Sequence, residues 1–404
     1  MRISLIALAG RTRAPGAPYS SGGAENDLTV PARGRRGRVL GAQLGTSGSA
    51  ARHRLWSHCL AGGAVATALA LAGDFASADE TGESFWTPGS FASLAATASQ
   101  PGFSLTSTYY HTWTSAGSDV ARARLIRIGR LTGEVGENVS AISIQPEDLA
   151  MVTPTYTFAT PVLGAQAALA VQATYGRRRT TADAIISGQS LLGPSTDSRF
   201  ETFSDTVTSF GDLAPQFSLR WNTGVHNIMT YVTGNIPVGA YSRERLSNIG
   251  IGHSAVDAGG GYTYFNEQTG YEFSAIAGLT YNFVNPYTQY RNGVDVHFDW
   301  GASRFLTKQL QIGLVGYLYN QASCDGGSGD RVGCFQSRVA SAGGQLGYTI
   351  PMGDLDANVN VKAYWEFAAA NRPEGWNLWL SYTLSPAEPK PARSTAPQRR
   401  ADAR

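Results

Sequence analysis

Apolar and polar residues alternate along the segment YEFSAIAGLTYNF. One alternate set is apolar throughout and consists of Tyr271, Phe273, Ala275, Ala277, Leu279, Tyr281 and Phe283. The other set is polar or glycine except for Ile276. Successive side chains of a strand point to opposite faces, so the segment is predicted to be a strand with one apolar face. The aromatic residues stand at both ends of that face, which is typical of a strand whose ends lie at the two interfaces of a bilayer.

The same alternation recurs along the chain, for example in NGVDVHFDWGA and ANVNVKAYWEF. It predicts about twelve strands, each about as long as a tilted membrane strand or slightly longer. Their ranges are 103–115, 148–158, 163–175, 212–221, 226–236, 254–264, 271–283, 292–302, 309–319, 338–350, 357–367 and 376–384. Long loops are expected at 116–147, 176–211 and 320–337, and tight connections at TPVLG and VNPYTQYRNG.

These strands predict an all-β fold, a transmembrane antiparallel β-barrel of about 12 strands (10–14) with a polar lumen. Their polar faces carry Asp, His, Lys and Glu, which a dry core does not accept without partners. In hydrocarbon, a closed barrel is the sheet that satisfies every backbone group. A secreted β-sandwich shows similar alternation and is the alternative. In a barrel, Ala277→Arg is expected to block or destabilise membrane insertion, and Gly278→Arg to be tolerated for folding and to narrow the lumen.

Composition favours an exported β-rich protein. The 404 residues include 47 Gly, 18 Tyr and 16 Phe, and only 15% are charged. The formal net charge of +2 gives no general attraction to nucleic acid.

The N-terminal part predicts export to the outer membrane of a Gram-negative bacterium. Residues 1–50 are interpreted as a disordered or mis-annotated extension, and 51–78 as a Sec-type signal peptide cleaved near Ala78 and Asp79. Residues 79–102 are predicted to form an arm or plug, 103–385 the barrel, and 386–404 a disordered, basic, Pro-rich tail. Within the arm, FWTPGSFASLAATAS (85–99) is apolar but too short to span a membrane as a helix. It is expected to fold inward as a plug, with a periplasmic arm as the alternative.

Cys324 and Cys334 bracket the Gly/Asp-rich segment CDGGSGDRVGC. In an oxidising compartment they predict a disulfide that closes an extracellular loop. A zinc site is the alternative, although no His lies nearby.

The polar faces of the strands supply the candidate site residues. The predicted lumen lining consists of Arg220, Glu272, Asp295, His297, Asp299, Tyr317, Tyr319, Lys362, Tyr364 and Glu366. Its charges are of mixed sign, and its tyrosines offer surfaces on which a ring could stack. A metal ion could be bound by Asp295, His297 and Asp299. These residues are two positions apart on one strand, however, and such side chains are too far apart to converge on one ion without a neighbouring strand, which favours a polar lumen wall. No catalytic residue, metal site or cofactor is predicted, because no GxSxG elbow or phosphate loop is present.

Several segments resemble, in order and spacing, the outer-membrane proteins of the meta-pathway phenol-degradation family. They are FWTPGSFASLAA (85–96), DLAPQFSLRWNTGVHNIMTYVTGNIPVGAY (212–241), NIGIG (248–252), AVDAGGGYTYFNEQTGYEFSAIAGLTYNFVNPYTQYRNGVDVHFDW (255–300) and EFAAANRPEGWNLWLS (366–381). The family is similar to the long-chain fatty-acid channels. The resemblance implies transport of hydrophobic or aromatic solutes, possible links to aromatic-compound catabolism, and contact with outer-membrane lipid and the barrel-assembly machinery.

Three functions follow from these observations. A channel for hydrophobic or aromatic small molecules is expected first. A structural or adhesive barrel without solute flux is the alternative. An outer-membrane enzyme comes last, because it requires a nucleophile or metal cluster that the sequence does not offer.

Overall fold

A computed structural model describes residues 84–117, 137–189, 196–330, 333–334 and 336–388. The predicted extension 1–50, the predicted signal peptide 51–78 and the tail from 389 onward lie outside the described residues. No helix among the described residues is long and apolar enough to cross a membrane.

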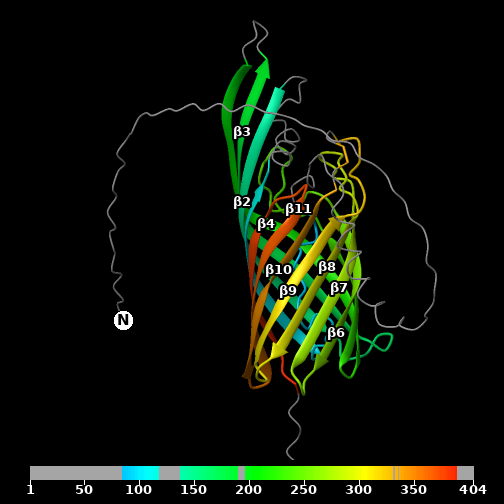
Figure 1. The fold of residues 1–404 in the computed structure, drawn as a ribbon. Coiled ribbons are helices and arrows are strands. Elements are labelled where there is room, and N and C mark those ends of the chain that lie inside the picture. The colour runs from blue at the N-terminus through cyan, green and yellow to red at the C-terminus, as the bar shows by residue number, and fades with distance from the viewer. Residues whose placement is uncertain (1–83, 118–136, 190–195, 331–332, 335, 389–404) are drawn as a thin grey trace, which may run out of the picture. The chain divides into compact units, whose positions relative to one another are not determined.

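The described chain forms a closed antiparallel barrel of twelve strands (Figure 1). Neighbours in sequence pair along the whole barrel, and β1 pairs with β12 to close it. The strands are β1 (Gly102–Ala116), β2 (Glu137–Thr157), β3 (Gln166–Gln189), β4 (Thr196–Thr223), β5 (His226–Asn235), β6 (Ala255–Asn266), β7 (Tyr271–Asn282), β8 (Asp295–Phe305), β9 (Leu310–Gln321), β10 (Arg338–Met352), β11 (Leu355–Ala370) and β12 (Glu374–Pro386). The prediction of an antiparallel barrel of about twelve strands is confirmed.

The two ends of the barrel differ in their connections. At one end, the turn end, residues 224–225, 267–270, 306–309 and 353–354 join neighbouring strands. At the other, the loop end, the β5–β6, β7–β8 and β9–β10 connections span 236–254, 283–294 and 322–337. VNPYTQYRNG therefore belongs to a loop-end connection, and its prediction as a tight turn was wrong.

The predicted long loop 176–211 was also wrong. Most of it continues β3 and β4, which pair from Gln166↔Arg220 to Gln189↔Thr196. The two strands extend with β2 beyond the rest of the barrel wall (Figure 1). This part carries Arg177, Arg178 and Arg179, and such charged strands lack the apolar alternation that marks the barrel wall.

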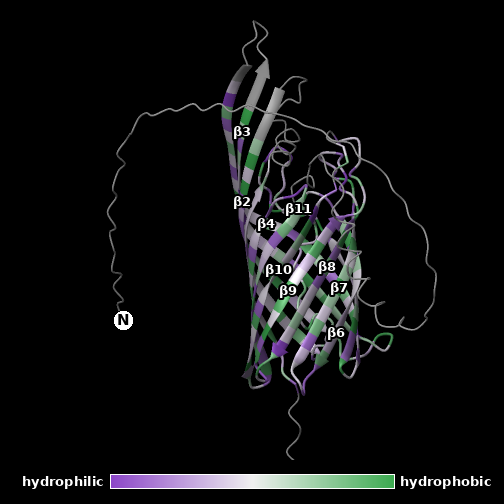
Figure 2. Ribbon diagram, in the orientation of Figure 1, coloured by the Kyte–Doolittle hydropathy of each residue, from purple (hydrophilic) through white to green (hydrophobic). Residues whose placement is uncertain are grey.

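Alternation along each strand separates the outer from the inner face. In β7, Leu279 is 55% exposed, whereas Thr280 is fully buried. Hydrophobic residues recur along the strands of the wall, between hydrophilic ones (Figure 2). The apolar side chains of the wall thus point outward and the polar ones point into the barrel. Ile276 is the exception noted in the sequence, and it is buried inside against Trp86 and Tyr231.

Candidate functional site in the barrel interior

The segment before β1, residues 84–101, bonds to the inner side chains of several strands, and we call it the N-terminal segment. The backbone N–H groups of Gly89 and Phe91 donate to the two oxygens of Asp299 on β8, at 3.2 and 3.1 Å. Lys362 Nζ on β11 donates to the carbonyl oxygen of Gly89 at 2.6 Å. An acidic side chain of β8 and a basic side chain of β11 therefore hold this backbone turn in the interior.

A second carboxylate holds the segment nearer the turn end. The Leu94 N–H donates to Glu272 Oε1 on β7 at 2.9 Å, and Ser303 donates to Oε2 of the same carboxylate at 2.6 Å. The Ala96 N–H donates to Thr263 Oγ1 on β6 at 3.1 Å. These contacts satisfy backbone groups that a buried segment without secondary structure would otherwise leave unpaired.

An aromatic contact joins the N-terminal segment to a polar triad in the wall. The Trp86 ring stacks on His297 at a centroid distance of 3.7 Å. His297 Nε2 lies 3.0 Å from Asp257 Oδ2 and 3.2 Å from the Tyr231 hydroxyl. Thr280 donates to the same Asp257 oxygen at 2.6 Å. The triad is buried under the indole, and its members come from β5, β6 and β8.

Close packing around this triad explains why two nearby positions are glycine. A Cβ on Gly278 would lie 2.3 Å from the Tyr231 oxygen and 2.4 Å from His297 Nε2. A Cβ on Gly261, in the GGG run of β6, would lie 1.8 Å from Ile276 Cδ1. The interior is therefore filled at this level, and this packing opposes the expectation that Gly278→Arg is tolerated.

The ten residues predicted to line the lumen all lie on inward positions. Nine of them are buried, and Arg220 is partly buried. The structure brings Glu272, Asp299 and Lys362 together with the N-terminal segment and places Asp295 apart, beside Asn282. Among the described residues, no three His, Cys, Asp or Glu side chains are arranged to hold a metal ion.

The predicted tyrosines belong to an aromatic cluster on the β1 and β9–β12 side. Tyr317 packs against Tyr364 at 5.1 Å and donates to Glu366 Oε1 at 2.6 Å. Tyr110 and Trp379 belong to the same buried cluster. These side chains fill their side of the interior rather than lining an open passage there.

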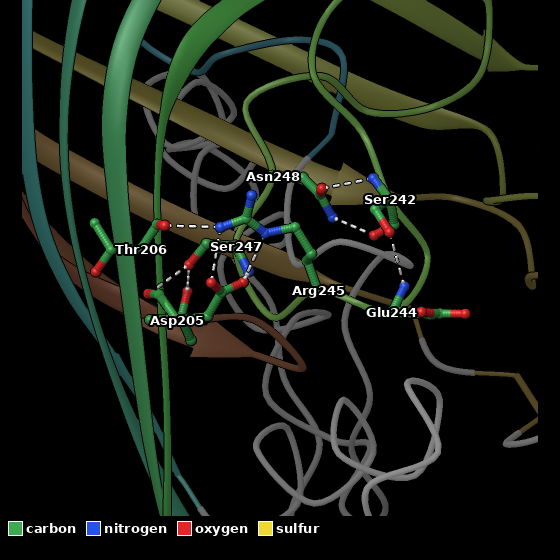
Figure 3. A network of polar contacts seen from close by, with 8 residues as sticks. Asp205, Thr206, Ser242, Glu244, Arg245, Ser247 and Asn248 are labelled. Carbon is green, nitrogen blue, oxygen red and sulfur yellow. Dashed lines mark hydrogen bonds and ion pairs between the residues drawn. The ribbon is translucent and has the colours of Figure 1, made fainter.

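The β5–β6 loop, residues 236–254, lies against β3 and β4 at the loop end (Figure 3). Asp205 on β4 accepts hydrogen bonds from Arg245 Nε at 3.1 Å, Arg245 Nη2 at 2.8 Å and the Ser247 N–H at 3.0 Å. Asp205 lies in the extension of β4 beyond the wall, and its hydrogen bond from Arg245 lowers the pKa of its carboxyl group. Within the loop, the Ser242 N–H donates to Asn248 Oδ1 at 2.8 Å, and Asn248 donates back to the Ser242 carbonyl.

Asp212, nearer the turn end of β4, holds both arms of this loop. It accepts from the N–H groups of Gly239 at 2.8 Å and Ile251 at 2.9 Å, and from Asn235 Nδ2 at 2.9 Å. Two aspartates of β4 thus fix the loop against the inner face of the barrel at its loop end.

The interior is not filled on the β2–β5 side. A cavity of about 240 Å³ lies between the N-terminal segment and these four strands. Trp86 and Phe91 line it from the segment, and Gln172, Gln216 and Arg220 line it from the wall. We call this space the β2–β5 cavity.

Several interior residues escaped the sequence prediction. Tyr231 and Asp257 lie on β5 and β6, whose alternation is weaker, although strict counting of alternate positions from Asn227 would have placed Tyr231 inside. Glu147 and Arg178 form a buried ion pair at 2.9 Å, in parts of β2 and β3 that the sequence assigned to loops. The backbone donors of the N-terminal segment have no sequence signal.

Cys324 and Cys334 are joined by a disulfide in the β9–β10 connection. This connection lies at the loop end, and Gly326 within it pairs with Arg291 of the β7–β8 connection. The linkage therefore closes a loop that is also attached to its neighbour.

Several solved structures share a remote likeness in fold with this chain. An outer-membrane channel from Pseudomonas putida F1 has a TM-score of 0.49 and 11% identity, covering 74% of this chain and 98% of that one. A Pseudomonas aeruginosa FadL homologue has a TM-score of 0.34 and 9% identity, covering 71% and 90%. The Ralstonia pickettii toluene transporter TbuX has a TM-score of 0.31 and 8% identity, covering 71% and 90%.

No curated protein sequence matches the chain. One family model matches residues 148–382, which is more than half of the sequence and includes β3–β11, about half of β2 and most of β12. The matched range contains most of the wall, the whole β5–β6 loop, and the strand residues that hold the N-terminal segment. The chain therefore belongs to the family described as "Putative MetA-pathway of phenol degradation".

Proposed function

We propose that this chain forms an outer-membrane channel of a Gram-negative bacterium that moves hydrophobic or aromatic small molecules. The observation that carries the proposal is a closed barrel, apolar outside and polar inside, whose interior keeps a cavity beside an inward-folded segment. The family description, with its reference to phenol degradation, supports an aromatic solute.

The outer surface supports a membrane setting. Side chains such as Phe273, Leu279 and Leu314 are 44–63% exposed on the wall. Soluble monomers rarely expose apolar patches larger than a few hundred square ångströms, whereas a bilayer covers such a surface. Tyr271 and Tyr281 lie near opposite ends of β7, as expected of rings at the two interfaces. Lipid is thus the proposed partner of this face.

The interior supports restricted passage rather than a wide pore. The N-terminal segment acts as a plug in this proposal, because it bonds to β6, β7, β8 and β11 and leaves its other side facing the β2–β5 cavity. A solute crossing the barrel passes on the β2–β5 side or displaces the segment. Either route suits a small molecule.

The remaining features of the proposal concern export and assembly. A Sec-type signal cleaved near Ala78 and Asp79 delivers the chain to the periplasm, and the barrel-assembly machinery inserts it. The turn end then faces the periplasm and the loop end, with the disulfide, faces the outside, as in other outer-membrane barrels.

A structural or adhesive barrel without solute flux is the second candidate. The aromatic cluster around Tyr317 favours it, because that side of the interior is filled with buried side chains. The β2–β5 cavity favours the channel, because a purely structural barrel has no need of an unfilled interior space.

Solute entry into liposomes distinguishes the two candidates. The full chain is reconstituted, and swelling rates are measured with a phenolic solute and with a sugar, each compared with protein-free liposomes. The channel predicts protein-dependent entry of the phenolic solute that exceeds entry of the sugar. Rates equal to those of protein-free liposomes for both solutes would favour the structural barrel.

A further inference from the structure

The β2–β5 cavity has the size and the walls of a site for a single aromatic ring. Its volume of about 240 Å³ exceeds the roughly 150 Å³ of an engineered apolar cavity that binds benzene. Phe85, Trp86 and Phe91 of the N-terminal segment supply ring surfaces, and Ala168 and Ala170 of β3 leave room opposite them. A one-ring solute therefore fits with space for one substituent.

Two hydrogen-bond donors in the lining have no acceptor. The Trp86 side chain is 5% exposed, and its buried Nε1 has no partner among the described residues. The buried Nε of Arg220 likewise has none, whereas its Nη1 donates to Ser218 Oγ at 2.8 Å. An indole N–H and a guanidinium N–H can donate but cannot accept. Buried donors of this kind are normally satisfied, so both call for an acceptor that the protein itself does not provide.

The charge of the cavity is also unbalanced. Among the described residues that line it, Arg220 is the only charged one, and no Asp or Glu is present. Elsewhere in the interior, Arg178 has a carboxylate partner in Glu147, and Lys362 donates to a carbonyl of the N-terminal segment. A neutral hydrocarbon in this cavity would leave both donors unpaired, which opposes its binding.

We propose that the β2–β5 cavity binds a small aromatic carboxylate, with its ring against Trp86 and Phe91 and its carboxylate on Arg220. A carboxylate offers two acceptor oxygens, which match the fork of a guanidinium, and its charge balances the lone cation. This inference rests on the proposed channel function and narrows its solute class to ring compounds that carry an acid group. Benzoate is the simplest probe of this chemistry.

Binding to the full chain in detergent tests the site without transport. Isothermal titration calorimetry compares benzoate with benzyl alcohol, which keeps the ring but not the charge, and with acetate, which keeps the charge but not the ring. Benzoate is expected to bind at least about 10-fold more tightly than either. Arg220→Gln should weaken benzoate binding by about 10- to 100-fold, the loss typical of a hydrogen bond to a charged group, and leave benzyl alcohol unchanged.

Two further variants keep the test decisive. Arg199→Gln is the matched control, because Arg199 is exposed on the extension of β4 and pairs with Glu201. It should bind benzoate as the unaltered chain does. Ala170→Phe fills the cavity without altering its charge and should abolish benzoate binding even if the Arg220 variant fails to fold. Unchanged benzoate affinity in folded Arg220→Gln or in Ala170→Phe overturns the proposal, and so does acetate binding as tight as benzoate.

Measurements of solute flux distinguish failure of the proposed carboxylate site from failure of the proposed channel function. Liposomes that carry the unaltered chain and Arg220→Gln are compared for entry of benzoate and of phenol. Entry of both solutes at rates that Arg220→Gln leaves unchanged would retain the channel and refute the carboxylate site. Tight benzoate binding without any protein-dependent flux would retain the site and refute the channel.

Discussion

Asp299→Asn is expected to loosen the N-terminal segment from the barrel wall. The carboxylate accepts one backbone N–H on each oxygen, from Gly89 and Phe91. An amide keeps one acceptor oxygen, so one bond persists in a weaker neutral form and the other N–H loses its acceptor. A hydrogen bond to a charged group contributes about 1.5–3 kcal/mol and a neutral one about 0.5–1.5 kcal/mol. With the orphaned donor included, the substitution should destabilise the docked segment by about 3 kcal/mol, or roughly 100-fold in the ratio of docked to released states.

The segment should nevertheless remain mostly docked in this variant. Burial of a tryptophan side chain removes about 150–250 Å² from water, which corresponds to about 4–6 kcal/mol at 25 cal/mol per Å². Trp86 is buried on His297, and the contacts to Glu272, Thr263 and Lys362 also remain. The predicted change is therefore in how often the segment opens.

Thiol labelling measures that opening. Ala96 is fully buried within the segment, so Ala96→Cys should react with a water-soluble maleimide only when the segment is released. The labelling rate should rise by about 100-fold when Asp299→Asn is added. Asp183→Asn is the matched control, because Asp183 lies on the exposed extension of β3 and bonds to Thr202. Equal labelling rates with and without Asp299→Asn would refute the claim that this carboxylate holds the segment.

Other substitutions test the wall and the loop. Ala277→Arg places a charge on the outward face of β7 and should cost about 2–4 kcal/mol near the bilayer midplane. The measurement is the folded fraction in lipid vesicles, which should be lower than for the unaltered chain. Insertion at the normal yield would contradict the assignment of Ala277 to the outward face. Gly278→Arg should also fail to fold, because its Cβ alone would lie 2.3 Å from the Tyr231 oxygen, and a normally folded yield would show that the interior is looser than described. Asp205→Asn should loosen the part of the β5–β6 loop around Arg245 and increase its cleavage by trypsin, at a cost of about 1 kcal/mol after allowance for the exposure of Arg245. The pKa of Asp205 is lowered in the folded protein. Its contribution to stability is therefore complete above the unfolded pKa near 4 and is lost as the pH falls through the folded pKa. Measurements of loop mobility that do not use trypsin should therefore show release of the loop only in acid.

Hydrophobic alternation was sufficient to predict the barrel wall, because each wall strand has one apolar and one polar face. It failed where that contrast disappears. The extension of β3 and β4 beyond the wall carries Arg177 and Arg179 on one face and Arg178 and Thr180 on the other, so the pattern resembled a loop. Pairing continues there because the two strands run directly on from the wall.

The sequence was sufficient to predict which single residues point into the interior, but not how those residues contact one another and the N-terminal segment. Alternation placed Asp299 and Lys362 inside, yet nothing in their spacing showed that both would hold the backbone of residues 84–101. Backbone donors carry no sequence signal. The donors of Gly89 and Phe91 are also more than 200 positions away in the chain from their acceptor, Asp299. Ile276 was a usable clue, because an apolar residue on a polar face indicates that something other than water packs against it.

Phenol entry into liposomes before and after chemical blockage of the β2–β5 cavity tests the central claim most directly. Gln216→Cys places a thiol in the cavity lining, and Thr202→Cys places one on the extension of β4, outside the cavity. The account predicts protein-dependent phenol entry in both variants, and a loss of that entry when a bulky thiol reagent modifies position 216 but not position 202. Phenol entry no faster than in protein-free liposomes would contradict the channel, and entry unaffected by modification at position 216 would contradict passage through this cavity.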